Sequence, residues 1–113
     1  MHEISICEGI LQVIEDQAVA HNFTQVKSLR LEVGPMAGIE LEALHFSYEV
    51  VTRGTIADKS KLEVIRLPVQ AWCMPCSKPV KVEQRFEACP ECGSYQVEIN
   101  GGDELRIKDM EVN

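Results

Sequence analysis

Apolar residues recur at steps of three and four over the first twenty positions, which is the spacing of one face of an α-helix. The stripe and the residues that widen it are Ile4, Ile6, Cys7, Ile10, Leu11, Val13, Ile14 and Ala18. Ser5 and Glu8 fit a capping box, so the regular helix begins either near Ser5 or at Glu3. Asn22 suits a left-handed residue that ends the helix.

The pattern then changes to alternation. Leu29, Leu31 and Val33 alternate with charged residues, which predicts a strand over Val26–Gly34 with one buried face. A second helix is predicted from about Glu40 to Arg53, and Gly54 stands where a helix C-cap belongs. Its stripe is Leu41, Leu44, Tyr48 and Val51, with Phe46 and Val50 beside it.

Later segments predict five further stretches of strand. Lys61–Leu67 reads as a strand that stops at Pro68. Pro79–Val82 and Gln84–Glu87 fit the two arms of a short hairpin. Another hairpin is predicted between Tyr95–Asn100 and Glu104–Val112, because Asn-Gly-Gly-Asp between them is a strong turn signal.

The order of these elements predicts an α+β fold. We expect a small three-stranded sheet with two helices on one face, plus an inserted zinc-ribbon-like module. The parent domain is then discontinuous, with residues 1–68 and 95–113 on either side of a module at residues 69–94.

Charge and hydropathy narrow the range of functions. The chain of 113 residues has a formal net charge of −7, which is poor for binding nucleic acid and reasonable for handling cations. It contains no apolar run long enough for a membrane span and no signal-peptide pattern at its start. An exposed set of cysteines without a secretion signal points to the cytoplasm.

The cysteines carry the clearest chemistry. Cys73-Met74-Pro75-Cys76 and Cys89-Pro90-Glu91-Cys92-Gly93 supply four thiolates at the spacing of a structural zinc site. Gly93 frees the backbone behind the second turn. Iron, held as in a rubredoxin, suits the same shell. Two disulfides, or four unligated thiols, are the plainer alternatives. Trp72 is expected to pack beneath the first turn.

A second metal site is predicted at the first residues. The Met1 amine, the His2 backbone nitrogen and the His2 imidazole can close two fused rings around nickel(II) or copper(II). The fourth donor comes from the Glu3 backbone or carboxylate, or from elsewhere, such as Glu40 if the two helix starts are neighbours. The plainer alternative is that His2 and Glu3 are ordinary polar residues at a frayed terminus. Cys7 is expected to be a small buried hydrophobe.

Together these features resemble one family. Met1-His2-Glu3 opening an amphipathic helix, Val33-Gly34 ending the first strand, and the two late cysteine pairs resemble the HypA/HybF nickel metallochaperones. That family serves maturation of [NiFe] hydrogenases and, in some bacteria, urease. The resemblance covers nearly the whole chain.

The resemblance implies a carrier and not an enzyme. It implies transported Ni(II) at Met1, His2 and Glu3, with Glu40 as a further candidate ligand, and structural Zn(II) held by Cys73, Cys76, Cys89 and Cys92. The implied partners are a nickel-handling maturation GTPase, HypB-like, and the [NiFe] hydrogenase large-subunit precursor, with no nucleic acid and no membrane. Dimers occur among relatives, so a homodimer is one of the expected states.

Two other classes of protein share parts of this pattern. A zinc-ribbon nucleic-acid or transcription-associated binding module would use Lys78, Lys81 and Arg85 as a small basic patch. The acidic total and the expected lack of interleaved exposed aromatic residues argue against it. A rubredoxin-like redox protein would be coloured and would contain iron.

Overall fold

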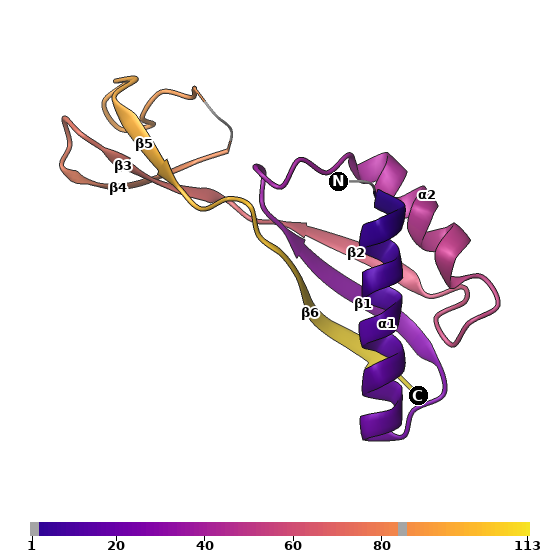
Figure 1. Ribbon diagram of the computed structural model, residues 1–113. Helices are drawn as coiled ribbons and strands as arrows, with labels where there is room; N and C mark the ends of the chain where they lie inside the picture. The colour runs from indigo at the N-terminus through magenta and orange to yellow at the C-terminus, as the bar shows by residue number, and fades with distance from the viewer. Residues whose placement is uncertain (1–2, 84–85) are drawn as a thin grey trace. The chain divides into compact units, whose positions relative to one another are not determined.

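The computed structural model describes residues 3–83 and 86–113. Its elements in chain order are α1 (Glu3–His21), β1 (Val26–Val33), α2 (Leu41–Thr52), β2 (Lys61–Arg66), β3 (Val69–Cys73), β4 (Lys78–Val82), β5 (Val97–Asn100) and β6 (Leu105–Val112). The strands form two three-stranded sheets, in the orders β2-β1-β6 and β4-β3-β5 (Figure 1). The predicted α+β class is confirmed.

The chain divides into two compact units. The helical unit consists of Met1–Leu31, Ile39–Val64 and Ile107–Asn113, and the cysteine unit consists of Glu32–Gly38 and Ile65–Arg106. Within the described ranges 3–83 and 86–113, neither helix has the length and hydropathy needed to cross a membrane.

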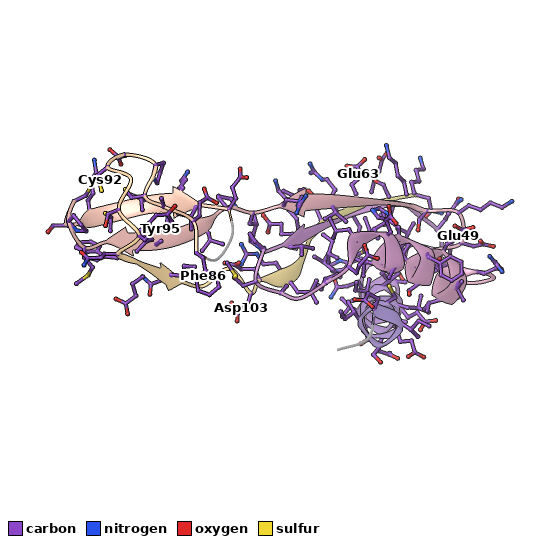
Figure 2. The ribbon with its side chains drawn as sticks, turned by 90° about the horizontal axis from the view of Figure 1, so that it is seen from above. Glu49, Glu63, Phe86, Cys92, Tyr95 and Asp103 are labelled. Carbon is purple, nitrogen blue, oxygen red and sulfur yellow. The ribbon has the colours of Figure 1, made fainter. Side chains whose placement is uncertain are left out.

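In the helical unit, both helices cover the same face of the β2-β1-β6 sheet (Figures 1 and 2). Its core is made of aliphatic side chains that are almost completely buried: Ile14, Val26, Leu29, Leu31 and Leu44. Leu29 and Leu31 stand on one face of β1, as the alternating pattern predicted.

The buried face of α1 is narrower than the predicted apolar face. Its buried residues are Ile6, Cys7, Ile10 and Ile14. Ile4, which the stripe included, is 50% exposed, and Val13 is 45% exposed. The apolar surface of this helix is wider than the surface that α2 and the sheet cover, so periodicity marked the buried residues together with some that are exposed.

The ends of the helices follow their predicted signals. Asn22 has a φ of 56° after α1, and Gly54 has a φ of 78° just past α2. Both values lie in the left-handed region that terminates helices. On α2, Leu44 and Tyr48 are buried as predicted, whereas Phe46 is 67% exposed and Val50 is 40% exposed.

The outer face of β1 is polar. Arg30 forms a two-pronged ion pair with Asp109 of β6. In the cysteine unit, the Arg106 Nε donates to a Glu32 carboxylate oxygen at 2.8 Å. Cross-strand charge pairs of this kind help to fix which strands are neighbours.

The predicted hairpin between Tyr95–Asn100 and Glu104–Val112 is wrong, because β5 pairs with β3 and β6 pairs with β1. The turn residues Gly101 and Gly102 do have positive φ, at 79° and 90°. The backbone groups of this segment bond to residues 34–36 instead of folding back. Gly34 N–H donates to the Glu104 carbonyl at 2.8 Å, and Met36 N–H donates to the Gly102 carbonyl at 2.6 Å.

In the predicted hairpin of Pro79–Val82 and Gln84–Glu87, the first arm pairs with a different strand. β4 pairs antiparallel with β3, with Val69 opposite Val82 and Cys73 opposite Lys78. Gln84 and Arg85 lie outside the described residues, and Phe86 is not in a strand. The strand β3 was not predicted, although Val69, Ala71 and Cys73 alternate with polar or exposed positions as a half-buried strand requires.

The core of the cysteine unit is built from small residues. Its buried members are Val69, Ala71, Cys73, Val80, Val82 and Cys89. Trp72 lies on the opposite face of β3, between Pro79 and Glu98, and is 39% exposed. The prediction that it packs beneath the first cysteine turn is wrong, because adjacent side chains of a strand point to opposite faces.

Candidate metal centres

Four sulfur atoms meet beyond the end of β3. Cys73 is the last residue of β3, Cys76 lies in the turn that follows, and Cys89 and Cys92 lie in a second turn before β5. Their Sγ atoms all lie within 4.8 Å of one another. The two Cys-x-x-Cys segments therefore form a single constellation.

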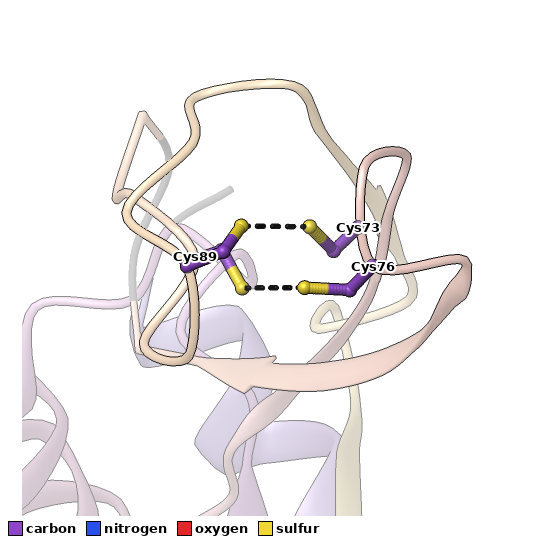
Figure 3. A group of neighbouring side chains, drawn as sticks. Cys73, Cys76 and Cys89 are labelled. Atoms are coloured by element: carbon purple, nitrogen blue, oxygen red, sulfur yellow. Dashed lines mark hydrogen bonds between the residues drawn. The ribbon is translucent and has the colours of Figure 1, made fainter.

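The sulfur spacing tests which chemistry fits. The Sγ atoms of Cys73 and Cys92 are 3.6 Å apart, and those of Cys76 and Cys89 are 4.0 Å apart (Figure 3). A tetrahedron with zinc–sulfur bonds of about 2.3 Å has edges of about 3.8 Å. A disulfide requires about 2.05 Å. The five cysteines are free thiols. The constellation fits a four-thiolate zinc site and excludes the alternative of two disulfides.

The two turns have the same backbone geometry. Ser77 N–H donates to the Cys73 carbonyl at 2.9 Å, and Gly93 N–H donates to the Cys89 carbonyl at 2.8 Å. The residue after each second cysteine has positive φ, 52° at Ser77 and 76° at Gly93. Each turn thus curls its two sulfurs toward the same point. Gly93 adopts the positive φ without a Cβ to oppose it, in line with its predicted role behind the second turn.

The thiols differ in how readily they ionise. Burial opposes ionisation of Cys89, but backbone N–H groups of Cys92 and Glu91 outweigh it and lower the pKa to about 7. Glu91 N–H lies 3.4 Å from the Cys89 sulfur. Hydrogen bonds with Cys92 and Cys73 raise the pKa of Cys76 to about 12. Cys89 therefore ionises more readily than Cys76, and a bound cation would favour the thiolate form of both.

A cation of the protein lies beside this cluster. Lys78, the first residue of β4, forms an ion pair with Glu91 of the second turn. Its pKa is raised, first by the hydrogen bond and charge of Glu91 and further by the charges of Cys76 and Cys89. This ion pair links the two cysteine turns through side chains and offsets part of the negative charge of the thiolates.

The predicted nickel ligands lie at the other end of the sequence. Met1 and His2 lie outside the described residues. Glu3 is the first residue of α1, so the helix has the earlier of its two predicted starts. A Glu3 carboxylate oxygen accepts the backbone N–H of Glu40 at 3.3 Å. The starts of the two helices are therefore neighbours.

Glu40 is the N-cap of α2. Its side-chain oxygens accept the backbone N–H groups of Glu42 at 3.2 Å and of Ala43 at 2.9 Å. These bonds satisfy two of the donors that a helix start leaves unpaired. The carboxylate is close to Glu3 in the structure, but its oxygens already serve the helix.

Cys7, a further candidate ligand, lies in the core of the helical unit. Cys7 is completely buried, as predicted, and its Sγ donates to the Leu44 carbonyl at 3.6 Å. Burial and the charge of Glu3 raise its pKa to about 11, so it stays a neutral thiol. In the part of the chain that the structure describes, the four cysteines are the only group of three or more metal-ligating side chains close enough for one ion.

Comparison with known proteins decides the family. The family model described as "Hydrogenase/urease nickel incorporation, metallochaperone, hypA" matches residues 1–112. The chain belongs to the HypA family. The family is one of metallochaperones and not of enzymes, as the sequence analysis expected.

Named relatives agree with this assignment along the full length. The Hydrogenase maturation factor HypA of Alkalilimnicola ehrlichii is 54% identical over 113 residues, covering 100% of both chains. HypA of Azotobacter vinelandii is 52% identical over 112 residues, or 99% of each chain. The solution structure of the Ni metallochaperone HypA from Helicobacter pylori has a TM-score of 0.67 at 21% identity, covering 99% of this chain and 97% of that one. At that identity the likeness supports the HypA fold alone.

Membership of the HypA family decides between the classes of protein that the sequence analysis considered. The family's role in nickel incorporation implies partners in hydrogenase maturation. Both the transcription module and the rubredoxin-like protein are set aside by a match that spans nearly the whole chain. The four-cysteine cluster fits the zinc site that the sequence predicted.

Sequence reasoning missed one group of surface residues. Phe86 is 90% exposed and Tyr95 is 77% exposed, so the cysteine unit does display aromatic side chains. This contradicts the expected lack of interleaved exposed aromatic residues, since Phe86 directly follows Arg85 of the basic patch in sequence. Phe86 stands between charged residues, and that isolation was the signal available in the sequence. Tyr95 begins an alternating pattern with Val97 and Ile99, so nothing in the sequence marked it as exposed.

Proposed function

We propose that this chain carries Ni(II) bound at its N-terminus and delivers it for maturation of [NiFe] hydrogenase, with urease as a second class of recipient. The donors are the Met1 amine, the His2 backbone nitrogen and imidazole, and Glu3. The observation that carries the proposal is the family match over residues 1–112, which includes this terminal tripeptide. A short terminal chelate leaves nickel exchangeable, as a carrier requires.

Glu40 is proposed as a further nickel ligand. Its nearness to Glu3 supports this role. Its two capping hydrogen bonds compete with this role. A carboxylate oxygen that binds nickel can no longer accept the backbone N–H of α2 that it now accepts. Nickel binding at Glu40 would therefore loosen the first turn of that helix.

We also propose that Cys73, Cys76, Cys89 and Cys92 hold a structural zinc ion. The sulfur spacing and the matched turns support it. Bound zinc would supply the positive charge that keeps four thiolates together, and with it the folding free energy of the surrounding segment. As a division of labour, nickel handling belongs to residues 1–68 and 95–113, and the zinc module is residues 69–94.

The proposed partners follow from the carrier role. They are a HypB-like GTPase that handles nickel and the precursor of the hydrogenase large subunit, and the proposed site of action is the cytoplasm. A homodimer is a proposed resting state. Neither a nucleic acid nor a membrane is proposed as a partner, because the chain has a net charge of −7.

Two measurements test the carrier role. Nickel titrated into the zinc-loaded protein with an untagged N-terminus should bind at about one equivalent, and X-ray absorption should show nitrogen and oxygen neighbours. Nickel bound mainly by sulfur would contradict the terminal site. Size-exclusion chromatography with the maturation GTPase should show co-elution with nucleotide or nickel present, and separate elution in every condition would refute that pairing.

A further inference from the structure

We propose that the free edge of β5 is a docking site for an extended segment of a partner protein that carries a lysine or arginine. A groove of about 350 Å³ lies at this edge. Its lining residues are Phe86, Glu87, Tyr95, Val97, Glu98 and Ile99. All of them belong to the cysteine unit.

The groove follows the backbone edge of β5. In the sheet order β4-β3-β5, this strand is hydrogen-bonded to β3 along one edge and is outermost along the other. Successive side chains of a strand point to opposite faces. Because Val97, Glu98 and Ile99 in succession all line one groove, the groove runs along the edge and not over a single face. An extended peptide that lies there can add a fourth strand through backbone hydrogen bonds.

Two aromatic rings stand exposed at this groove. Phe86 is 90% exposed and Tyr95 is 77% exposed, and Figure 2 shows both on the cysteine unit. Phe86 also has a φ of 63°, a conformation that bulky residues seldom adopt. An aromatic side chain that stays exposed to water in this way contributes little to the free energy of folding. Exposed aromatic residues are enriched where proteins bind partners.

The charge of the groove selects the occupant. Glu87 and Glu98 line it, and neither takes part in any ion pair that joins the described residues. The Glu87 carboxylate accepts only the backbone N–H of Glu83, at 3.2 Å, among its hydrogen bonds with the described chain. Two carboxylates beside two aromatic rings suit a lysine or arginine, which binds both by ion pairing and by cation–π contact. Val97 and Ile99 offer an apolar strip to its aliphatic stem.

The same charges disfavour a second copy of this chain as the occupant. Two β5 edges paired antiparallel would bring the Glu98 carboxylates of both copies near each other, and like charges across a strand pair are destabilising. A nucleic acid is disfavoured for the same reason, since its phosphates would face Glu87 and Glu98. A cationic protein segment is the occupant that the groove fits.

The test uses the full-length, zinc-loaded protein. A phage-displayed library of random ten-residue peptides is selected on it and depleted on the double variant Tyr95→Ala/Glu98→Gln. Both positions are exposed, so the variant should keep its zinc and its circular dichroism spectrum. Enriched peptides should contain lysine or arginine between β-forming residues. In fluorescence anisotropy they should bind the double variant at least tenfold more weakly than the native protein.

A matched control removes the same kinds of side chain elsewhere. Phe46→Ala/Glu111→Gln changes an exposed aromatic residue and an exposed glutamate of the helical unit. It should bind the selected peptides as the native protein does. Three results would overturn the proposal: no enrichment over the double variant, enrichment of peptides without basic residues, or equal weakening in the control. A native dimer that Tyr95→Ala/Glu98→Gln dissolves would assign the edge to a second copy and would also overturn it.

That the docked partner takes part in nickel delivery rests on the proposed carrier function. That the groove binds basic peptides does not depend on that function. Nickel titration separates the two. A double variant that binds nickel normally and loses the peptides supports the docking site. If the native protein binds peptides but no nickel, the carrier function fails and the docking site stands.

Discussion

The two compact units are stabilised by different means. The completely buried side chains of the helical unit include Ile14, Leu29 and Leu44, each with 0% of its surface exposed. Among the described residues of the cysteine unit, no side chain larger than valine is buried to the same degree, and Cys73 and Cys89 are themselves part of its core. One unit has an aliphatic core of the usual kind, and the other is short of apolar volume.

This difference indicates which interactions stabilise each unit. Burial of a leucine or isoleucine contributes about 1.5–3 kcal/mol, so several of them hold a small layer of helices and strands together. A core of valine, alanine and thiols contributes much less, and small units of this kind usually depend on a metal or disulfides. Zinc should therefore govern the cysteine unit and leave the helical unit alone.

The largest expected effect comes from breaking the cysteine cluster. Cys89→Ala removes one of the four ligands, and structural zinc contributes on the order of 10 kcal/mol to folding of the segment that binds it. We expect zinc to be lost and amides of β3, β4 and β5 to exchange rapidly with solvent, while α1 and α2 stay protected. Elemental analysis and hydrogen exchange measure this. Retained zinc, or unfolding of both units together, would contradict the division.

The converse change weakens the helical unit. Leu44→Ala empties a completely buried position on α2 and should lower the free energy of unfolding by about 2–5 kcal/mol. Zinc content should remain one per chain. Val19→Ala is the control, because Val19 is 82% exposed and its truncation should change stability by less than about 0.5 kcal/mol. Chemical denaturation of the three proteins decides the matter, and zinc loss in Leu44→Ala would count against separate cores.

Changes at the N-terminus should affect nickel binding without affecting zinc binding. One glycine added before Met1 converts the terminal amine to an amide and should weaken nickel at least tenfold, or about 1.4 kcal/mol. His2→Ala removes the imidazole and should abolish tight binding. Lower pH should release nickel as protons compete for amine and imidazole. Calorimetric titration tests this, with zinc content and thermal stability unchanged. If all three proteins bind alike, other residues hold the nickel.

The smallest expected effect on stability comes from replacing Cys7, the cysteine outside the four-sulfur cluster. Cys7→Ala removes one buried sulfur from the contact with Leu44, and should cost about 1 kcal/mol of stability. Zinc and nickel stoichiometry should both stay the same, because Cys7 is a neutral thiol within an apolar contact. It is the matched control for Cys89→Ala, since each variant loses one cysteine. A loss of either metal in Cys7→Ala would place this thiol in a metal site.

Local signals predicted the elements and the cysteine constellation well. The helix ends at Asn22 and Gly54 followed from residue types that tolerate positive φ. The alternation of Leu29 and Leu31 correctly predicted the buried face of β1. The spacing of the four cysteines was enough to bring the sulfurs together, because each turn is formed within five residues.

Pairing of the strands was where prediction failed. Gly101 and Gly102 have the positive φ of a tight turn, yet the backbone around them bonds to Gly34 and Met36. A Cβ added to Gly34 would collide with the Gly102 carbonyl, so two glycines far apart in sequence allow this close passage. No local pattern reports such a crossing. The expected nickel ligands at residues 1–3 came from coordination chemistry and family resemblance and stay a prediction, because no periodicity concerns those positions.

The position of β6 has a consequence for synthesis. β1 lies between β2 and β6, and the ion pair of Arg30 with Asp109 joins residues 79 positions apart. While the ribosome is still adding the last strand, one edge of β1 lacks its neighbour, although the helices and β2 have already been made. The residues of α1 are made before those of β6, so the sheet that this helix covers stays open along one edge of β1 until β6 has been made. A nascent chain stalled before Leu105 would therefore expose the unpaired edge of β1 to aggregation.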